Sequence, residues 1–191
     1  MPRSRSLRVT GCAPAPRRIA SCPGSDVPRP VQADLIGLLD ALSTCDVEFI
    51  VVGGAAALLH GGLAMTQDLD IVPRLVSDNI ERLVAALAGI DTEIREPGTR
   101  HLRPTAELLA AGGQVRLLSN LGPLDVLGRL HDGRSYDDLL AHSEWIEDGT
   151  RHIRVVDLAT LIEIKSAAGR AKDRIVLPML VRLLQDRKTD T

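Results

Sequence analysis

VEFIVVGGAAALLHGGLAMTQDLDIVPR, residues 47–74, is the stretch of sequence that decides the expected fold. It opens with a β-branched run, residues 47–52, which predicts a buried strand. Two glycines follow, and then an Ala- and Leu-rich stretch at residues 55–60 predicts a short helix. Residues 69–72 form a second apolar run that stops at Pro73, and they predict a second strand.

Two aspartates, Asp68 and Asp70, stand two residues apart at the start of this second strand. Because alternate residues of a strand point to the same face, their carboxylates are expected to project together. Such carboxylates repel each other unless a cation lies between them. Mg²⁺ usually binds one or two carboxylates together with substrate phosphates, so the pair predicts a magnesium site, with Mn²⁺ as the alternative ion. Taken alone, D-x-D is common by chance and is typical of solvated aspartates at a strand end.

Gly53 and Gly54 lie between the first strand and the short helix. Glycine lets a phosphate approach the backbone closely, and the start of a helix favours an anion. A Gly-Gly pair after a strand is more often only a turn. Phosphoryl transfer needs at least a site for the phosphates and a site for a metal ion. A phosphate-binding turn beside a metal-binding carboxylate pair would supply both.

The rest of the chain alternates strands with helices. Further helices are expected at residues 34–42, 77–88 with Ser77 as the N-cap, 136–142, 157–168 with Asp157 as the N-cap, and 173–186. Further strands are expected at residues 114–118, 124–127 and 151–156, with a hairpin-like turn at 120–123. Residues 91–112 are ambiguous, partly because Pro97 and Pro104 interrupt any regular element. The alternation predicts an α/β or α+β fold, a small mixed sheet flanked by helices with a C-terminal helical tail.

Charge and composition divide the chain in two. Residues 1–30 are rich in proline and hold six arginines and one acid, so we expect a disordered or mis-annotated extension. The folded domain is expected over residues 31–187, with a core at 31–156 and a tail at 157–187. Beyond residue 30 the chain holds 17 basic and 24 acidic residues, a net charge of −7. A polynucleotide would therefore have to meet a local basic strip.

Several classes of protein are disfavoured by composition. No window reaches the ~18 apolar residues of a membrane span, so no membrane partner is expected. The three cysteines form no C-x-x-C pair, which suits a cytoplasmic protein. One Phe, one Trp and one Tyr are too few for a sheet that stacks RNA bases. The five histidines show no H-x-x-x-H spacing, which disfavours a zinc hydrolase.

The ordered set of motifs resembles the nucleotidyltransferases of the DNA polymerase β superfamily. The motifs are Gly-Gly-Ala-Ala at 53–56, His-Gly at 60–61 and Thr-Gln-Asp-Leu-Asp-Ile at 66–71. More narrowly, they resemble the minimal abortive-infection and toxin–antitoxin (AbiEii-like) nucleotidyltransferases, which read roughly G-G-x-A, h-G and T-x-D-h-D-h, where h is apolar or His. The resemblance implies a polymerase-β-type nucleotidyltransferase fold.

The resemblance also implies a third carboxylate on a neighbouring strand, and Asp125 within Gly-Pro-Leu-Asp-Val-Leu at 122–127 matches it. A charge inside an apolar strand is costly unless it is paired or metal-bound, which supports the assignment independently. Asp68, Asp70 and Asp125 would then be catalytic and hold the metal. The implied reaction moves a nucleoside monophosphate from a nucleoside triphosphate to an acceptor hydroxyl, with Asp125 also a candidate proton acceptor.

The tail continues the resemblance. Residues 157–165 and 168–173 match the group's D-L-h-x-x-K and G-R-x-K-D ending, and Asp173 would pair with one of the basic residues or cap the last helix. A solvated basic helix end is the alternative interpretation. The nucleotide-binding residues implied in all are Gly53, Gly54, Thr66, Lys165, Arg170 and Lys172.

The resemblance leaves the acceptor open among RNA, a tRNA end, a protein and a small molecule. It also implies a toxin–antitoxin or phage-defence setting with a cognate toxin or antitoxin as partner. Residues 63–65, Leu-Ala-Met, replace a cation that many relatives carry, and Gly54 replaces the Ser of better-known members. The missing cation keeps a rival open: a non-catalytic nucleotide- or partner-binding module on the same fold. Turnover would separate the two.

Overall fold

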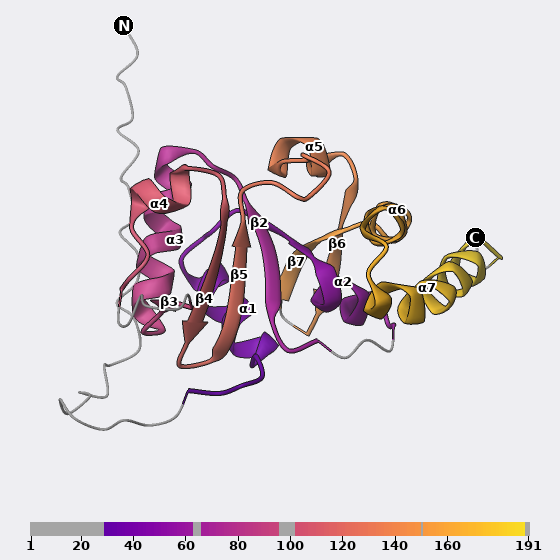
Figure 1. Ribbon diagram of the computed structural model, residues 1–191, viewed down its shortest axis with the longest axis horizontal. Helices are drawn as coiled ribbons and strands as arrows, with labels where there is room; N and C mark the ends of the chain where they lie inside the picture. Colours follow the sequence, from indigo (N-terminus) through magenta and orange to yellow (C-terminus); the bar gives the residue numbers. More distant parts are fainter. Residues whose placement is uncertain (1–28, 63–65, 96–101, 150, 190–191) are drawn as a thin grey trace, which may run out of the picture.

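A computed structural model describes residues 29–62, 66–95, 102–149 and 151–189 of the chain (Figure 1). The expectations for residues 1–28 and for the missing cation at 63–65 lie outside the described residues. In chain order the elements are α1 Leu35–Thr44, β1 Phe49–Val52, α2 Gly53–Leu59, β2 Leu69–Pro73, α3 Ser77–Gly89, β3 Glu93–Ile94, α4 Ala106–Ala110, β4 Gln114–Ser119, β5 Gly122–Leu127, α5 Tyr136–Leu140, β6 Ser143–Asp148, β7 Arg151–Val156, α6 Leu158–Ala168 and α7 Ala171–Thr189.

The described strands form one mixed sheet of seven strands in the order β3-β4-β5-β2-β1-β7-β6. β1 is antiparallel to β2 and parallel to β7, and β2 is parallel to β5. The two strands predicted from residues 47–74 therefore lie next to each other near the centre of the sheet. Ile50, Val51, Leu69 and Ile71 are fully buried there, which explains the apolar runs that predicted both strands.

Helices cover the sheet, and the chain ends in two of them, as predicted. α1 packs against α3 and α3 against α4, while α6 packs against α7. Figure 1 shows α3 and α4 at one side of the sheet and α7 projecting from the opposite side. None of the described helices is long and apolar enough to cross a membrane.

One of the two predicted N-caps is confirmed: Asp157 accepts a hydrogen bond from the Thr160 N–H at 2.7 Å. Asp34, which was not predicted as a cap, accepts one from the Gly37 N–H at 3.0 Å at the start of α1. The prediction for Ser77 is wrong, because Val76 is the N-cap of α3 and makes no side-chain cap.

Hydrogen bonds of the Asn79 side chain hold the start of α3 instead. Its side chain accepts from the Glu48 N–H at 2.7 Å and donates to the Glu48 and Arg74 carbonyls, each at 2.8 Å. These bonds tie the helix to the residues that flank β1 and β2. They satisfy backbone groups outside the helix, which a serine cap would not reach.

Residues 91–112, which the sequence left ambiguous, contain the short β3 and α4. Two further elements differ from the prediction. α2 begins at Gly53 itself, two residues before the expected start, so both glycines lie in its first turn. β6 was not predicted; it pairs antiparallel with β7 as an edge strand. Its sequence, Ser-Glu-Trp-Ile-Glu-Asp, is mostly polar and lacks the alternation that would have indicated a strand.

Candidate active site

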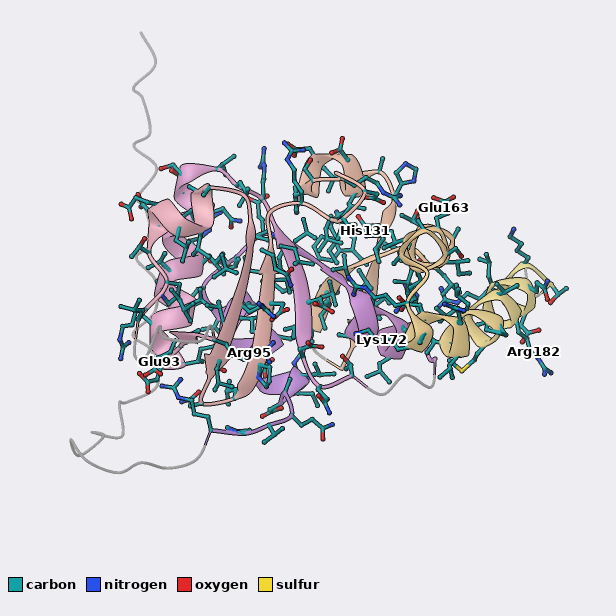
Figure 2. All side chains as sticks on the ribbon, in the orientation of Figure 1. Glu93, Arg95, His131, Glu163, Lys172 and Arg182 are labelled. Atoms are coloured by element: carbon teal, nitrogen blue, oxygen red, sulfur yellow. The ribbon has the colours of Figure 1, made fainter. Side chains whose placement is uncertain are left out.

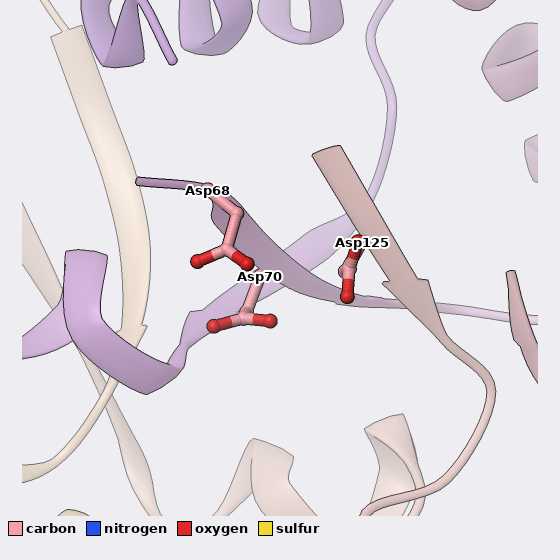
Figure 3. Close-up of side chains that lie close together, drawn as sticks. All are labelled: Asp68, Asp70 and Asp125. Atoms are coloured by element: carbon pink, nitrogen blue, oxygen red, sulfur yellow. The ribbon is translucent and has the colours of Figure 1, made fainter. Parts of the chain in front are cut away.

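Three aspartates meet at the centre of the sheet. Asp70 in β2 and Asp125 in β5 are direct register partners on parallel strands, and Asp68 comes just before β2. One oxygen from each carboxylate lies within 4.8 Å of the other two. Figure 3 shows the three side chains gathered at β2 and β5. Asp125 is buried, and Asp68 and Asp70 are partly buried. The ladder of strand hydrogen bonds thus brings together residues that are more than fifty positions apart in the chain.

The charges of neighbouring carboxylates disfavour the ionised form of Asp70. Burial raises the pKa of Asp70 to about 7, the charges of Asp68 and Asp125 add to the rise, and Lys172 and Lys165 oppose it. Burial also raises the pKa of Asp125, against the opposing charge of Arg95. Three hard oxygen donors with excess negative charge are the ligand chemistry that Mg²⁺ and Mn²⁺ select. The residues present therefore fit a divalent cation.

Asp125 is held by two side chains that the sequence did not single out. The Arg95 guanidinium donates to its Oδ1 at 3.3 Å, and the Gln114 amide donates to its Oδ2 at 3.1 Å. Gln114 lies in β4, which pairs with β5, and Arg95 directly follows β3. No local pattern marks either residue, because both contacts depend on the pairing of strands.

Position 53 must be glycine because the backbone at the end of β1 lies close to the Asp70 carboxylate. Its φ is +68°, in the left-handed region, and a Cβ there would lie 2.0 Å from Asp70 Oδ2. A Cβ at Gly54 would similarly lie 2.6 Å from Thr66 Oγ1. Any side chain at Gly53 would therefore displace the Asp70 carboxylate.

Thr66 supports Asp68. Its hydroxyl donates to the Asp68 carbonyl at 2.8 Å and lies 3.3 Å from the Asp68 carboxylate. Thr66 thereby fixes the chain just before β2. The predicted contact of Thr66 with a nucleotide stays a prediction.

A cavity of about 240 Å³ opens beside the carboxylates on the side of α6. Gly53 and Asp70 form one wall, and Lys165 and Arg170 come from α6 and the connection to α7. Arg129, in the segment after β5, also lines the cavity and was not predicted. The cavity lining therefore combines three cationic side chains with the carboxylates of Asp70 and Asp173.

Lys165 and Asp173 form an almost buried ion pair, with Nζ 3.0 Å from Oδ1 and side-chain exposures of 11% and 6%. The sequence predicted that Asp173 either pairs with a basic residue or caps the last helix. In the structure it pairs with Lys165. Lys172 is exposed and acts on Asp70 through its charge. Figure 2 shows Lys172 on the α6–α7 side of β2 and Arg95 on the β3–β4 side.

Comparisons with known proteins give a likeness of fold among solved structures. No family model and no curated protein sequence matches the chain significantly. Among solved structures, the chain is similar to a Thermotoga maritima protein named "putative nucleotidyltransferase". That likeness has 18% sequence identity and a TM-score of 0.46, and it covers 78% of this chain and 90% of the other.

Proposed function

We propose that this protein is a Mg²⁺-dependent nucleotidyltransferase of the polymerase β type, which transfers a nucleoside monophosphate from a nucleoside triphosphate to an acceptor hydroxyl. The observation that supports this most is the convergence of Asp68, Asp70 and Asp125 beside Gly53 and a cationic cavity. These aspartates would hold Mg²⁺ or Mn²⁺, which supplies charge neutralisation of the phosphates when bound.

The proposed step is a displacement at the α-phosphorus. The acceptor oxygen forms a bond to that phosphorus, and the bond to the oxygen that bridges to the β-phosphate breaks. Pyrophosphate leaves with the electron pair. The hydroxyl proton passes to the Asp125 carboxylate, whose raised pKa makes it a better base than an exposed aspartate.

The cavity beside α6 suits the triphosphate. Lys165 donates to Asp173 and keeps two of its three ammonium protons for phosphate oxygens. Within the described residues, the Arg170 side chain forms no ion pair, so its guanidinium is available to bind phosphate oxygens through two parallel hydrogen bonds. Lys172, Thr66 and the backbone of Gly53 and Gly54 complete the proposed nucleotide-binding set.

The non-catalytic rival has one observation in its favour. Both Asp125 oxygens already accept hydrogen bonds, from Arg95 and Gln114, so this carboxylate is partly neutralised without a metal. A domain that binds a nucleotide without turnover would tolerate this arrangement. Under the enzyme proposal, the protein would be cytoplasmic and of the AbiEii-like group. It would act with a cognate toxin or antitoxin.

The test uses the full chain with Mg²⁺, each labelled nucleoside triphosphate, total RNA and cell lysate. We expect labelled product and pyrophosphate with the wild type and with Asp186→Asn, a matched change of an exposed aspartate on α7. We expect neither with Asp68→Asn/Asp70→Asn. If no triphosphate gives product above the double variant under varied metal, the binding module replaces the enzyme.

A further inference from the structure

We propose that Arg116 and Arg95 form an anion-binding strip on the open face of β3 and β4, which takes the backbone phosphates of a single-stranded polynucleotide acceptor. The inference rests on the proposed function and names the acceptor for it. It concerns the side of the carboxylates opposite the α6 cavity.

The strip and the carboxylates form one row across the sheet. The Arg95 N–H donates to the Arg116 carbonyl at 2.7 Å, Arg116 is the register partner of Asp125, and Asp125 is the register partner of Asp70. Residues directly opposite each other on paired strands share a face, and neighbouring strands lie ~4.8 Å apart. The two arginines therefore lie one and two strands from Asp125, on the face that carries the reaction.

Arg116 is the cation of this row that no described residue neutralises. Its side chain is exposed and makes no hydrogen bond or ion pair with the described part of the chain. Its charge nevertheless reaches Asp125, where it opposes the rise in pKa. Arg95, 37% exposed, contacts Asp125 directly. A guanidinium held beside the reacting groups with its donors uncommitted is suited to a phosphate.

The open form of the strip favours an extended ligand over a small molecule. β4 alternates, with Val115 and Leu117 buried and Gln114 and Arg116 exposed. Arg95 and Arg116 do not line the cavity beside α6, whereas Gln114 of the same face of β4 does. Small molecules are usually enclosed by concave, mostly apolar sites, whereas a single strand lies along a basic groove or face.

Charge and composition favour phosphate contacts over base contacts. The chain beyond residue 30 has a net charge of −7, so a polynucleotide requires a local basic strip, and this row supplies one next to the carboxylates. The chain has one Phe, one Trp and one Tyr, and they lie in β1, β6 and α5, outside β3 and β4. Binding is therefore expected to tolerate any base sequence and to weaken steeply with salt.

The experiment is fluorescence anisotropy of a short labelled RNA, and of DNA of the same sequence, with the full chain and no nucleoside triphosphate. Both oligonucleotides have a free 3′-hydroxyl. Arg116→Ala is expected to weaken binding of both about tenfold and to lower the slope of log affinity against log salt by about 0.7, the value for one phosphate contact to a single strand. Arg116→Lys should retain most of the slope. Arg182→Ala, an exposed arginine on α7 (Figure 2), should change neither quantity.

Nucleoside triphosphate binding, measured separately, should be equal in the wild type and Arg116→Ala, which also shows that the variant is folded. Equal oligonucleotide affinity and equal salt slope in Arg116→Ala and the wild type would overturn the strip, as would an absence of oligonucleotide binding by the wild type. Either result leaves nucleotidyl transfer to another acceptor intact. Conversely, Arg116-dependent binding without pyrophosphate release from any acceptor would support the strip and reject the enzyme.

Discussion

The carboxylates and the cations opposite them are held in different ways. Asp70 and Asp125 sit on paired strands, between the fully buried Leu69 and Ile71 in β2 and the buried Leu124 and Val126 in β5. The cations of the α6–α7 end are more loosely placed, since Arg170 and Lys172 are exposed. The proposed metal-binding half is thus fixed by the core, whereas the proposed phosphate-binding half includes two exposed side chains that the core does not hold. Changes in the first half should abolish the chemistry, and changes in the second should tune it.

The largest effect is expected from Asp70→Asn, which removes the central carboxylate. Transfer should fall by about 10²- to 10³-fold or more, since about 10²–10³ is the range for losing one charge-stabilising group of a reaction centre. Metal-free stability at pH 8 should rise, because a pKa of about 7 in place of 3.8 corresponds to a penalty of at most about 4 kcal/mol. Pyrophosphate release and thermal unfolding measure the two results. Lower stability together with retained activity would contradict the role of Asp70.

Gly53→Ala is expected to have the next largest effect. The new Cβ would meet Asp70 Oδ2 at 2.0 Å, and the backbone at φ +68° adds strain of about 1–2 kcal/mol. A displaced carboxylate should cost about 10²-fold in kcat. The matched control is Gly61→Ala, because Gly61 also has a positive φ but nothing lies within 4 Å of its Cβ. Equal losses of activity in both variants would show that strain alone is responsible.

Metal and pH should act together on stability. Between about pH 4 and pH 7 the folded state keeps a proton on Asp70 that the unfolded state has lost, so metal-free stability should fall as the pH rises. Mg²⁺ bound as proposed would relieve the repulsion only once the carboxylates are charged. The rise in Tm on adding Mg²⁺ should therefore be larger at pH 8 than at pH 5, and Asp70→Asn should lose this difference. An equal Mg²⁺ effect at both pH values would count against the metal site.

The smallest effect is expected from changes to the exposed cations at the α6–α7 end. Lys172 is exposed, so Lys172→Ala should raise KM for the nucleoside triphosphate about three- to tenfold and leave kcat nearly unchanged, as for one solvent-screened charged contact. Steady-state kinetics at low and high salt measure this, and the difference from the wild type should shrink at high salt. A fall in kcat as large as that of Gly53→Ala would mean that the two halves are equally rigid.

The sequence predicted the central strands well because their signals are local. An apolar run predicts each buried strand. Strand geometry alone predicts that Asp68 and Asp70, two residues apart, project to the same face. The hairpin of β4 and β5 was likewise predictable from Asn-Leu-Gly-Pro at residues 120–123. These features depend on near neighbours in the chain.

The features that were missed depend on pairing between distant segments. Arg95 and Gln114 reach Asp125 only because β3, β4 and β5 lie side by side. Arg129 and the α6 residues Leu161 and Lys165 line the same cavity although they lie more than 30 positions apart in the chain. The start of α3 is fixed by Asn79 through contacts with Glu48, 31 residues away, so no capping pattern at Ser77 could reveal it.

The most direct test of the central claim follows the two ends of the triphosphate separately. Full-length protein is incubated with Mg²⁺, acceptor and a nucleoside triphosphate labelled either at the α- or at the γ-phosphorus. Nucleotidyl transfer predicts that the α-label moves to the acceptor and that the γ-label is recovered in pyrophosphate, with both lost in Asp68→Asn/Asp70→Asn. Label from the γ-position on the acceptor, its release as inorganic phosphate, or the same products from the double variant would contradict the account.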